Sequence, residues 1–206
     1  GVQVNGIAKT PAMIITKNRD ETQHWRVHHQ ELIANYVLYL AENYEQIAPN
    51  GSNNGYIKTV GSTTYSTYES NADSLAVNGS SDKMISYCFA EVDGYSQFGG
   101  YNGNGADDND GAFVFTGFRP AFVMLKLVSA GGENWHMFDS TRSISNVVKA
   151  RFIADDSTGE NTSDSILDFT ANGFKHRDDN AGYNSQGGDY IYMAFAEAPF
   201  KYANAR

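Results

Sequence analysis

Short apolar runs alternate with polar positions along most of this chain, and clusters of Gly, Asn, Ser and Asp separate the runs. Runs of about four to nine residues, rich in aromatic and β-branched side chains, are typical of β-strands. In the first half the predicted strands are residues 12–17, 24–29, 35–40, 56–60, 74–77 and 83–92. In the second half they are residues 111–116, 121–128, 135–139, 147–152, 166–170, 173–176 and 190–196. This spacing favours antiparallel meanders or Greek keys over βαβ units, so the sequence predicts an all-β protein.

One segment also fits a helix, because Leu32, Tyr36 and Tyr39 recur at nearly helical spacing within residues 31–39. The corresponding segment of the second half, residues 147–152, is short and β-branched, so we predict a strand. In the strand at residues 83–92, bulky side chains (Ile85, Tyr87, Phe89) alternate with smaller ones. A strand of this kind is covered on both faces, which predicts a central position in a sheet.

The same landmarks occur twice in the same order. A Pro-Ala pair opens each copy (Pro11 and Pro120), and a Trp follows it (Trp25 and Trp135). An Asn-Gly pair comes next, and an aromatic strand ending in Ala-Glu closes each copy, at Glu91 and Glu197. Recurrence of this kind indicates a duplicated domain. We therefore predict two tandem antiparallel β-sandwich units of jelly-roll or lectin-like type, residues 1–93 and 94–206.

The two predicted copies differ at their beginnings. The segment between them is rich in Gly, Asn and Asp but also carries aromatic residues, so we predict a hairpin with arms at residues 95–101 and 112–115. The first copy has only residues 1–10 at the matching place and is N-terminally abbreviated, which suggests an excised or processed piece. Residues kept in both copies are expected to serve the fold, whereas chemistry peculiar to this protein should lie where the copies differ.

The net charge of the chain limits the kinds of molecule that it can bind. The chain has 206 residues and a formal net charge of −9. An acidic chain offers no basic face for a nucleic-acid backbone or an anionic membrane. No apolar stretch approaches the roughly 20 residues of a membrane span, and no signal-peptide pattern begins the chain. We expect neither nucleic-acid binding nor membrane insertion.

Signals for catalysis are weak. The single cysteine, Cys88, excludes an intrachain disulfide, and its place inside a predicted strand favours a small buried residue over a reactive thiol. Glu91 and Glu197 occupy equivalent places in separate copies, which is typical of structural carboxylates rather than of a glycosidase pair. The chain shows no nucleophile elbow and no phosphate-binding Gly loop. We expect no enzymatic activity.

Metal sites are also weakly indicated, and we expect no cofactor. The acidic candidates for calcium are Asp107, Asp108 and Asp110, but an EF-hand-type loop with its glycine at Gly111 would begin at Ala106, which cannot be a ligand. A solvated acidic turn is the alternative reading. A second set comprises His24, His28 and His29. The last two point to opposite faces of an extended strand, which argues against a shared metal.

Ligand recognition remains as the chemistry that these residues suit best. Aromatic faces stack on the apolar side of a pyranose, while amides and carboxylates bond its hydroxyls. The segments that differ most between the copies carry such side chains. Our candidate ligand-binding residues are Tyr44, Tyr56, Tyr65, His176, Arg177, Asp178, Asp179 and Tyr183. The alternative is that these segments are ordinary solvated loops.

Four strings carry a resemblance to a known family. They are the strings beginning at Gly117 (Gly-Phe-Arg-Pro-Ala-Phe-Val), at Trp135, at Asn172 (Asn-Gly-Phe-Lys) and at Tyr190 (Tyr-Ile-Tyr-Met-Ala-Phe-Ala-Glu). With these strings the whole chain resembles a duplicated domain of uncharacterised function. That domain is common in tail-fibre-like or lectin-like structural proteins of tailed, often marine, bacteriophages. No catalytic or ligand residue comes with this resemblance.

The resemblance implies a component of the virion surface, extracellular and assembled with other virion proteins, and a homo-oligomer, with a trimer favoured. Together with the aromatic loops, it leads us to expect a non-enzymatic adhesion module at a tail-fibre or appendage tip that recognises host cell-surface glycan. One alternative is capsid decoration or another purely structural virion role, which the position of the protein on intact particles would distinguish. A third is a glycan depolymerase, which would need a carboxylate pair in a groove.

Overall fold

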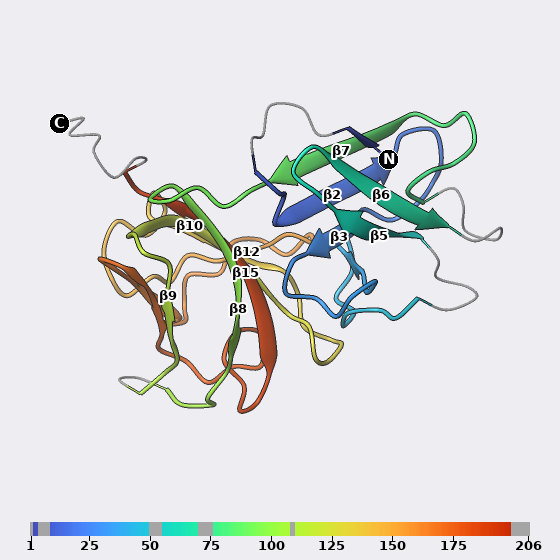
Figure 1. Cartoon of the computed structure of the whole chain (residues 1–206). Helices are drawn as coiled ribbons and strands as arrows, with labels where there is room; N and C mark the ends of the chain where they lie inside the picture. Colours follow the sequence, from blue (N-terminus) through green and yellow to red (C-terminus); the bar gives the residue numbers. More distant parts are fainter. Residues whose placement is uncertain (1, 4–8, 50–54, 70–75, 108–109, 199–206) are drawn as a thin grey trace. The chain divides into compact units, whose positions relative to one another are not determined.

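The computed structural model describes the chain except residues 1, 4–8, 50–54, 70–75, 108–109 and 199–206 (Figure 1). All of its regular elements in the described residues are β-strands, which pair antiparallel in several sheets, and no helix is present among them. The described part of the chain therefore contains no helix that could cross a membrane. The chain divides into two compact units, Gly1–Glu91 and Val92–Arg206. Each unit is described by itself below.

In its described residues, unit 1 contains two sheets. The larger has the order β4-β3-β2-β7 and the smaller β1-β6-β5. The strands of the larger sheet are β2 (Met13–Asn18), β3 (Arg26–His29), β4 (Leu38–Tyr39) and β7 (Met84–Phe89). Those of the smaller sheet are β1 (Val2–Gln3), β5 (Gly55–Val60) and β6 (Thr64–Glu69).

Unit 2 also contains a larger and a smaller sheet, ordered β12-β11-β10-β15-β8 and β13-β14-β9. The strands of the larger sheet are β8 (Ser96–Asn102), β10 (Pro120–Leu127), β11 (His136–Asp139), β12 (Phe152–Ile153) and β15 (Asp189–Ala196). Those of the smaller sheet are β9 (Phe113–Phe115), β13 (Leu167–Thr170) and β14 (Gly173–His176).

The pairing register of the larger sheets repeats from unit to unit. Ile14 pairs with Cys88 and His28 in unit 1, as Val123 pairs with Ala194 and Phe138 in unit 2. Two residues further along β2 and β10, Thr16 lies opposite Ser86 as Leu125 lies opposite Tyr192. The outer pairs Arg26–Tyr39 and His136–Ile153 match in the same way. The smaller sheets repeat as well, because β1-β6-β5 has the same chain order as β9-β14-β13.

The core of unit 2 lies between its two sheets. Val123, Leu125 and Tyr192 from the larger sheet join Phe169 and Phe174 from the smaller one in a single buried cluster. Strand alternation explains this arrangement, since residues two apart point to the same face. In unit 1 the corresponding cluster is smaller, with Ile14 packed against Ile57 and Tyr65.

The closing strand occupies different positions in the two units. β15 is central, between β10 and β8, and its residues Tyr190 to Ala194 are buried. β7 lies at the edge of the described sheet, beside β2 (Figure 1), and Ile85 and Tyr87 are exposed. Among the described residues, β7 therefore does not take the central position predicted for residues 83–92. Large side chains on one face of a strand do not reveal whether a neighbouring strand pairs with it.

The predicted hairpin at the start of unit 2 was also wrong. β8 pairs with β15, and β9 pairs with β14 in the other sheet. The two arms are close in sequence, but they belong to different sheets of unit 2. Local turn chemistry predicts a hairpin well only when no distant strand competes for the same edge.

Three predicted strands are shorter than expected, or absent, in the described residues. Within residues 31–39 the chain forms turns rather than a helix, and Asn35 has a φ of 71°. That left-handed conformation suits Asn and interrupts both a helix and a strand, so the strand is only Leu38–Tyr39, with an isolated bridge from Val37 to Ile47 before it. Residues 147–152 contribute isolated bridges at Val148 and Arg151 before β12 begins. Residues 76–77 form a turn, and residues 74–75 lie outside the described residues.

The Asn-Gly landmark is not equivalent in the two units. Asn172-Gly173 forms the turn between β13 and β14, whereas Asn78-Gly79 lies between β6 and β7. The turn that matches Asn172-Gly173 in chain order is the one between β5 and β6, which includes Gly61. Asn-Gly is a common turn pair, and its recurrence at a similar offset does not align the two turns.

Candidate functional site

The structure buries half of the eight predicted ligand-binding residues. Tyr56 lies in β5 and Tyr65 in β6, and both are less than a tenth exposed. The Tyr65 hydroxyl donates to Ser86 Oγ at 2.6 Å. His176 ends β14, Tyr183 lies in the loop before β15, and both are almost fully buried. These four side chains were expected in exposed loops, and that expectation of their position was wrong.

The other four predicted residues lie at the surface or partly so. Arg177 forms an ion pair with Asp168, so its guanidinium is held against the smaller sheet. The Asp178 carboxylate accepts the backbone N–H of Asn180 at 2.8 Å, which shapes the loop. Asp179 and Tyr44 are exposed. Tyr44 is in unit 1 and Asp179 in unit 2, so the eight residues form no single group.

Two buried imidazoles flank Tyr183 in unit 2. The His176 ring stacks on Tyr101 at 5.1 Å and on Tyr183 at 6.2 Å, while His136 meets Tyr183 edge-on at 5.6 Å. Neither imidazole has a hydrogen-bond partner on either ring nitrogen. Burial lowers the pKa of both histidines to about 3, and for His136 the positive charges of Arg151 and Lys126 add to the effect. Both rings are therefore neutral packing groups at neutral pH.

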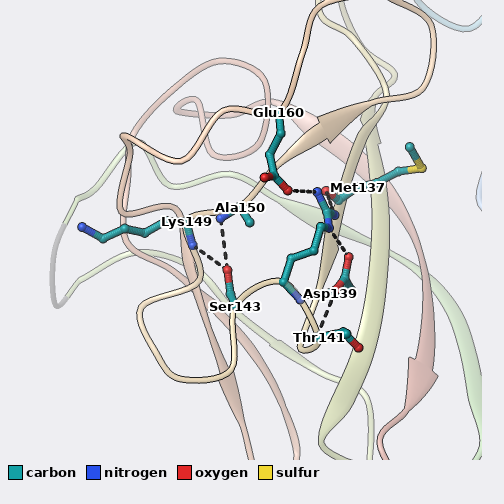
Figure 2. A network of polar contacts seen from close by, with 8 residues as sticks. Met137, Asp139, Thr141, Ser143, Lys149, Ala150 and Glu160 are labelled. Atoms are coloured by element: carbon teal, nitrogen blue, oxygen red, sulfur yellow. Dashed lines mark hydrogen bonds and ion pairs between the residues drawn. The ribbon is translucent and has the colours of Figure 1, made fainter.

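Arg142 joins Met137, Asp139 and Glu160, which are labelled in Figure 2, in one polar network beyond β11. Its guanidinium forms an ion pair with Asp139, donates to Glu160 at 3.1 Å and to the Met137 carbonyl at 3.2 Å. It also lies over the Phe152 ring, 4.2 Å from the centroid. Burial opposes ionisation of Asp139, but the hydrogen bonds from Arg142 outweigh it and hold the pKa of that carboxyl below its ordinary value. Because its nitrogens and its planar face are engaged, this arginine is a structural clamp rather than an anion receptor.

The predicted metal candidates do not converge. Asp107 and Asp110 are exposed in a turn, where the Asp110 N–H donates to the Asp107 carbonyl at 3.1 Å, and Asp108 lies outside the described residues. His24 pairs with Glu42 at 3.2 Å, His29 is buried, and burial lowers the pKa of His28 to about 4. Within the described ranges, no group of three or more His, Cys, Asp or Glu side chains is arranged to hold a metal ion.

The repeated carboxylates and the cysteine have structural surroundings. Glu197 forms an ion pair with Arg119 at 2.9 Å, and Glu91 accepts from the Gln30 amide at 3.1 Å. Cys88 is half-buried, and burial raises the pKa of its thiol. A raised pKa lowers the thiolate fraction and therefore the reactivity of the thiol.

An exposed aromatic pair on β9 is the surface feature that sequence reasoning missed. Phe113 and Phe115 are 49% and 64% exposed, whereas Val114 between them is buried in the core. Opposite Phe115 on β14 lies Gly173, so no side chain covers the ring from that strand. We call Phe113 and Phe115 the β9 aromatic face. The alternation Phe-Val-Phe was visible in the sequence, but the exposed side could not be told from it.

Polar groups border the β9 aromatic face. Asn172 is exposed in the turn before Gly173, and the Thr170 hydroxyl lies within hydrogen-bond distance of its amide oxygen, at 3.4 Å. The Lys175 side chain lies across from Phe113 in the register. Flat apolar rings next to amide and hydroxyl groups can stack on a sugar ring and bond its hydroxyls. This arrangement is the best candidate site in the described residues.

Comparison with known proteins gives a family and little else. Neither the curated proteins nor the solved structures contain a match to this chain. One family model matches residues 3–199, which is nearly the whole chain and spans both units. The chain therefore belongs to the family described as "Domain of unknown function (DUF7483)".

Proposed function

We propose that this chain is a non-enzymatic structural and adhesion module of a tailed-phage virion, exposed at a tail-fibre or appendage tip, that recognises host cell-surface glycan. Its two units are two copies of one β-sandwich. The phage origin rests on the sequence resemblance set out above. The matched registers of the larger sheets, such as Ile14 with Cys88 and Val123 with Ala194, support the duplication.

The β9 aromatic face is the observation that carries the glycan proposal. Contact between two exposed phenylalanine rings and water is unfavourable in free energy. An apolar surface that stays exposed despite this cost is often a binding surface. Contact with a single sugar through two rings is weak, so useful attachment needs several copies acting together. Presentation by an oligomer, with a trimer favoured, would supply them.

The charged groups of unit 2 support a role without catalysis. Arg142, Arg177 and Arg119 each form an ion pair with a carboxylate of the same unit. His136 and His176 are buried and neutral, so they are poorly placed as general acids or bases.

The test is a glycan array and a whole-cell binding assay with the full chain displayed multivalently. The double variant Phe113→Ser/Phe115→Ser should lose binding. Ile144→Ser is the matched control, because Ile144 is an 88% exposed apolar residue of the same unit, in the loop between β11 and β12, and this variant should bind normally. Wild-type protein that binds neither array nor cells would overturn the proposal, as would full binding by the double variant.

A further inference from the structure

The face of the larger sheet that meets the smaller sheet is more polar in unit 1 than in unit 2. In unit 1 this face is identified by Ser86 of β7, whose Oγ accepts a hydrogen bond from the Tyr65 hydroxyl of β6 at 2.6 Å. The matched registers place four polar side chains of unit 1 on this face, Thr16, Arg26, His28 and Ser86, at the positions of Leu125, His136, Phe138 and Tyr192 in unit 2. The interior of unit 1 therefore offers hydrogen-bonding groups where that of unit 2 is mostly apolar.

Arg26 is the arginine of this polar face. The residue is 4% exposed, and its guanidinium carbon lies 4.1 Å from the centroid of the Tyr39 ring. Tyr39 belongs to a buried cluster with Tyr56 of β5, so the guanidinium lies beside an aromatic contact between the two sheets. Neither Nε nor Nη1 of Arg26 has a hydrogen-bond partner among the described residues. Most of the N–H groups of this cation are therefore unsatisfied.

A buried arginine of this kind is energetically unfavourable by itself. Burial of a charge is tolerated when an opposite charge and hydrogen bonds compensate for the lost water. Arg119, Arg142 and Arg177 of unit 2 each have a carboxylate partner, whereas no described carboxylate forms an ion pair with Arg26. The Tyr39 ring compensates only in part, because the face of an aromatic ring accepts no hydrogen bond from N–H groups that lie in the guanidinium plane. Such a departure from ordinary packing is expected at functional sites.

Tyr39 also connects Arg26 with the surface of unit 1. The His24 ring stacks on Tyr39 with the ring centroids 4.8 Å apart, and the Tyr44 ring meets Tyr39 edge-on at 6.1 Å. Tyr44 is 48% exposed, and His24 is exposed as well. A single ring, that of Tyr39, thus contacts both the buried guanidinium and exposed aromatic groups.

We propose that unit 1 binds the carboxylate of an acidic sugar, with Arg26 as the buried anchor and Tyr44 as the platform for the sugar ring. The two oxygens of a carboxylate match the planar guanidinium, which can donate to both at once. The apolar side of a pyranose that carries this carboxylate packs on the Tyr44 ring. Because Nε and Nη1 are buried, the carboxylate enters as the exposed side chains of His24 and Tyr44 move aside. This site is in unit 1 and does not depend on the β9 aromatic face.

The first experiment follows the Arg26 Nε–H resonance of the full chain by NMR. That resonance is the one missing from the variant Arg26→Met. At least one of the sodium salts of galacturonic, glucuronic and N-acetylneuraminic acid should shift it in a saturable manner, whereas the neutral sugars galactose and glucose should not. Acetate should shift it with a dissociation constant roughly tenfold or more higher, because acetate has no ring to pack on Tyr44. The absence of a shift with all three acidic sugars would overturn the proposal, and acetate binding as tightly as the sugars would overturn the role of the sugar ring.

Substitutions separate the anchor from the platform. Arg26→Met keeps much of the side-chain volume and should abolish binding of the acidic sugar. The matched control is Lys58→Met, which removes an exposed cation of the same unit, 5.7 Å from the Tyr68 ring, and should bind normally. Tyr44→Ala should raise the dissociation constant of the sugar about tenfold and leave that of acetate unchanged. Undiminished binding by Arg26→Met, or loss of binding in Lys58→Met, contradicts the assignment of Arg26 as the anchor.

A stability measurement tests whether the guanidinium lacks a partner within the protein. In a Trp135→Phe background, Trp25 fluorescence reports urea unfolding of unit 1. Without added anion, Arg26→Met should unfold at a higher urea concentration, because the substitution removes a buried charge that has no counter-charge. Unfolding at a lower urea concentration would show that unit 1 itself satisfies Arg26, and the proposal would fail. Phe113→Ser/Phe115→Ser should leave the NMR titrations unchanged, so this site and the β9 aromatic face can fail separately.

Discussion

Unit 2 buries two neutral imidazoles, and we therefore expect low pH to destabilise this unit. His136 and His176 are 4% and 0% exposed, and burial lowers the pKa of each to about 3 from an ordinary value of 6.5. Below pH 6.5 the unfolded chain takes up two protons that the folded unit excludes, so the free energy of unfolding falls as the pH falls. The full stability is present above pH 6.5, and the loss continues down to about pH 3.

The size of the effect follows from proton linkage. Each excluded proton contributes about 1.4 kcal/mol per pH unit once the unfolded histidine is fully protonated. Between pH 7.5 and pH 4.5 this amounts to about 2.7 kcal/mol for each histidine and ~5 kcal/mol for the pair. That is a large part of the stability of an ordinary domain. Burial raises the pKa of Asp155, which acts with the opposite sign near its ordinary range, so the slope is best measured above pH 5.

Each unit contains one of the two tryptophans, which allows unit 2 to be followed alone. In the Trp25→Phe background, urea unfolding monitored by Trp135 fluorescence gives the free energy of unfolding at each pH. Adding His176→Phe should keep the stacking on Tyr101 and Tyr183, raise stability near pH 5 and halve the slope against pH. His24→Phe, in unit 1, should leave that slope unchanged. A flat profile between pH 7.5 and pH 5, or an undiminished slope in the His176 variant, would refute the reasoning.

Two further predictions concern close packing and the loop clamp. In Gly99→Ala a Cβ would lie 2.8 Å from the hydroxyl of Tyr192, which is buried in the core. We expect the free energy of unfolding, measured by chemical denaturation, to fall by more than about 1 kcal/mol. The control Gly159→Ala, whose Cβ would have no atom within 4 Å, should leave that free energy unchanged. Arg142→Ala should lower the free energy of unfolding by about 2 kcal/mol in the same assay. Arg142→Lys should lower it somewhat less, because lysine keeps the charge but cannot donate to all three acceptors at once. Equal stability of Arg142→Ala and wild type would show that the network in Figure 2 contributes little to folding.

The sequence was sufficient to predict the class of fold and most strands, because strand-forming runs and turn formers are local signals. Residues 121–128 and 190–196, for example, are nearly the observed β10 and β15. The pairing partners of the strands were harder to predict, as the segments around β8 and β9 show. Their neighbours β15 and β14 follow much later in the chain, and no local pattern specifies which distant edge a strand will join.

The candidate site was predicted less well, for a reason that lies in tyrosine and histidine themselves. Tyr183 and His176 have polar tips on apolar rings, so both can serve equally well in a core or at a surface. Here the loop between β14 and β15 looks polar in sequence but buries Tyr183 and Asn184. The Asn184 amide donates to the carbonyl of Asp178 in the same loop and to that of Ala106, in the segment between β8 and β9. The exposed phenylalanines, by contrast, look in sequence like ordinary core residues of a strand.

Some residues that recur in both units make the same backbone contact in each. Lys17 and Lys126 both donate through Nζ to the carbonyl of the following residue, at 2.7 Å. The carbonyls of Trp25 and Trp135 both accept a backbone N–H from the strand region beyond, at 3.0 and 2.9 Å. Such contacts stabilise a sheet.

Contact with other molecules is therefore to be sought where the units differ. In the described residues, unit 2 exposes the aromatic rings of Phe113 and Phe115 on β9. If this face binds glycan, Phe113→Ser/Phe115→Ser lowers the affinity of each single site, whereas a change in the number of copies displayed alters attachment to cells through valency alone. A monovalent sugar-binding measurement beside the whole-cell assay separates the two effects.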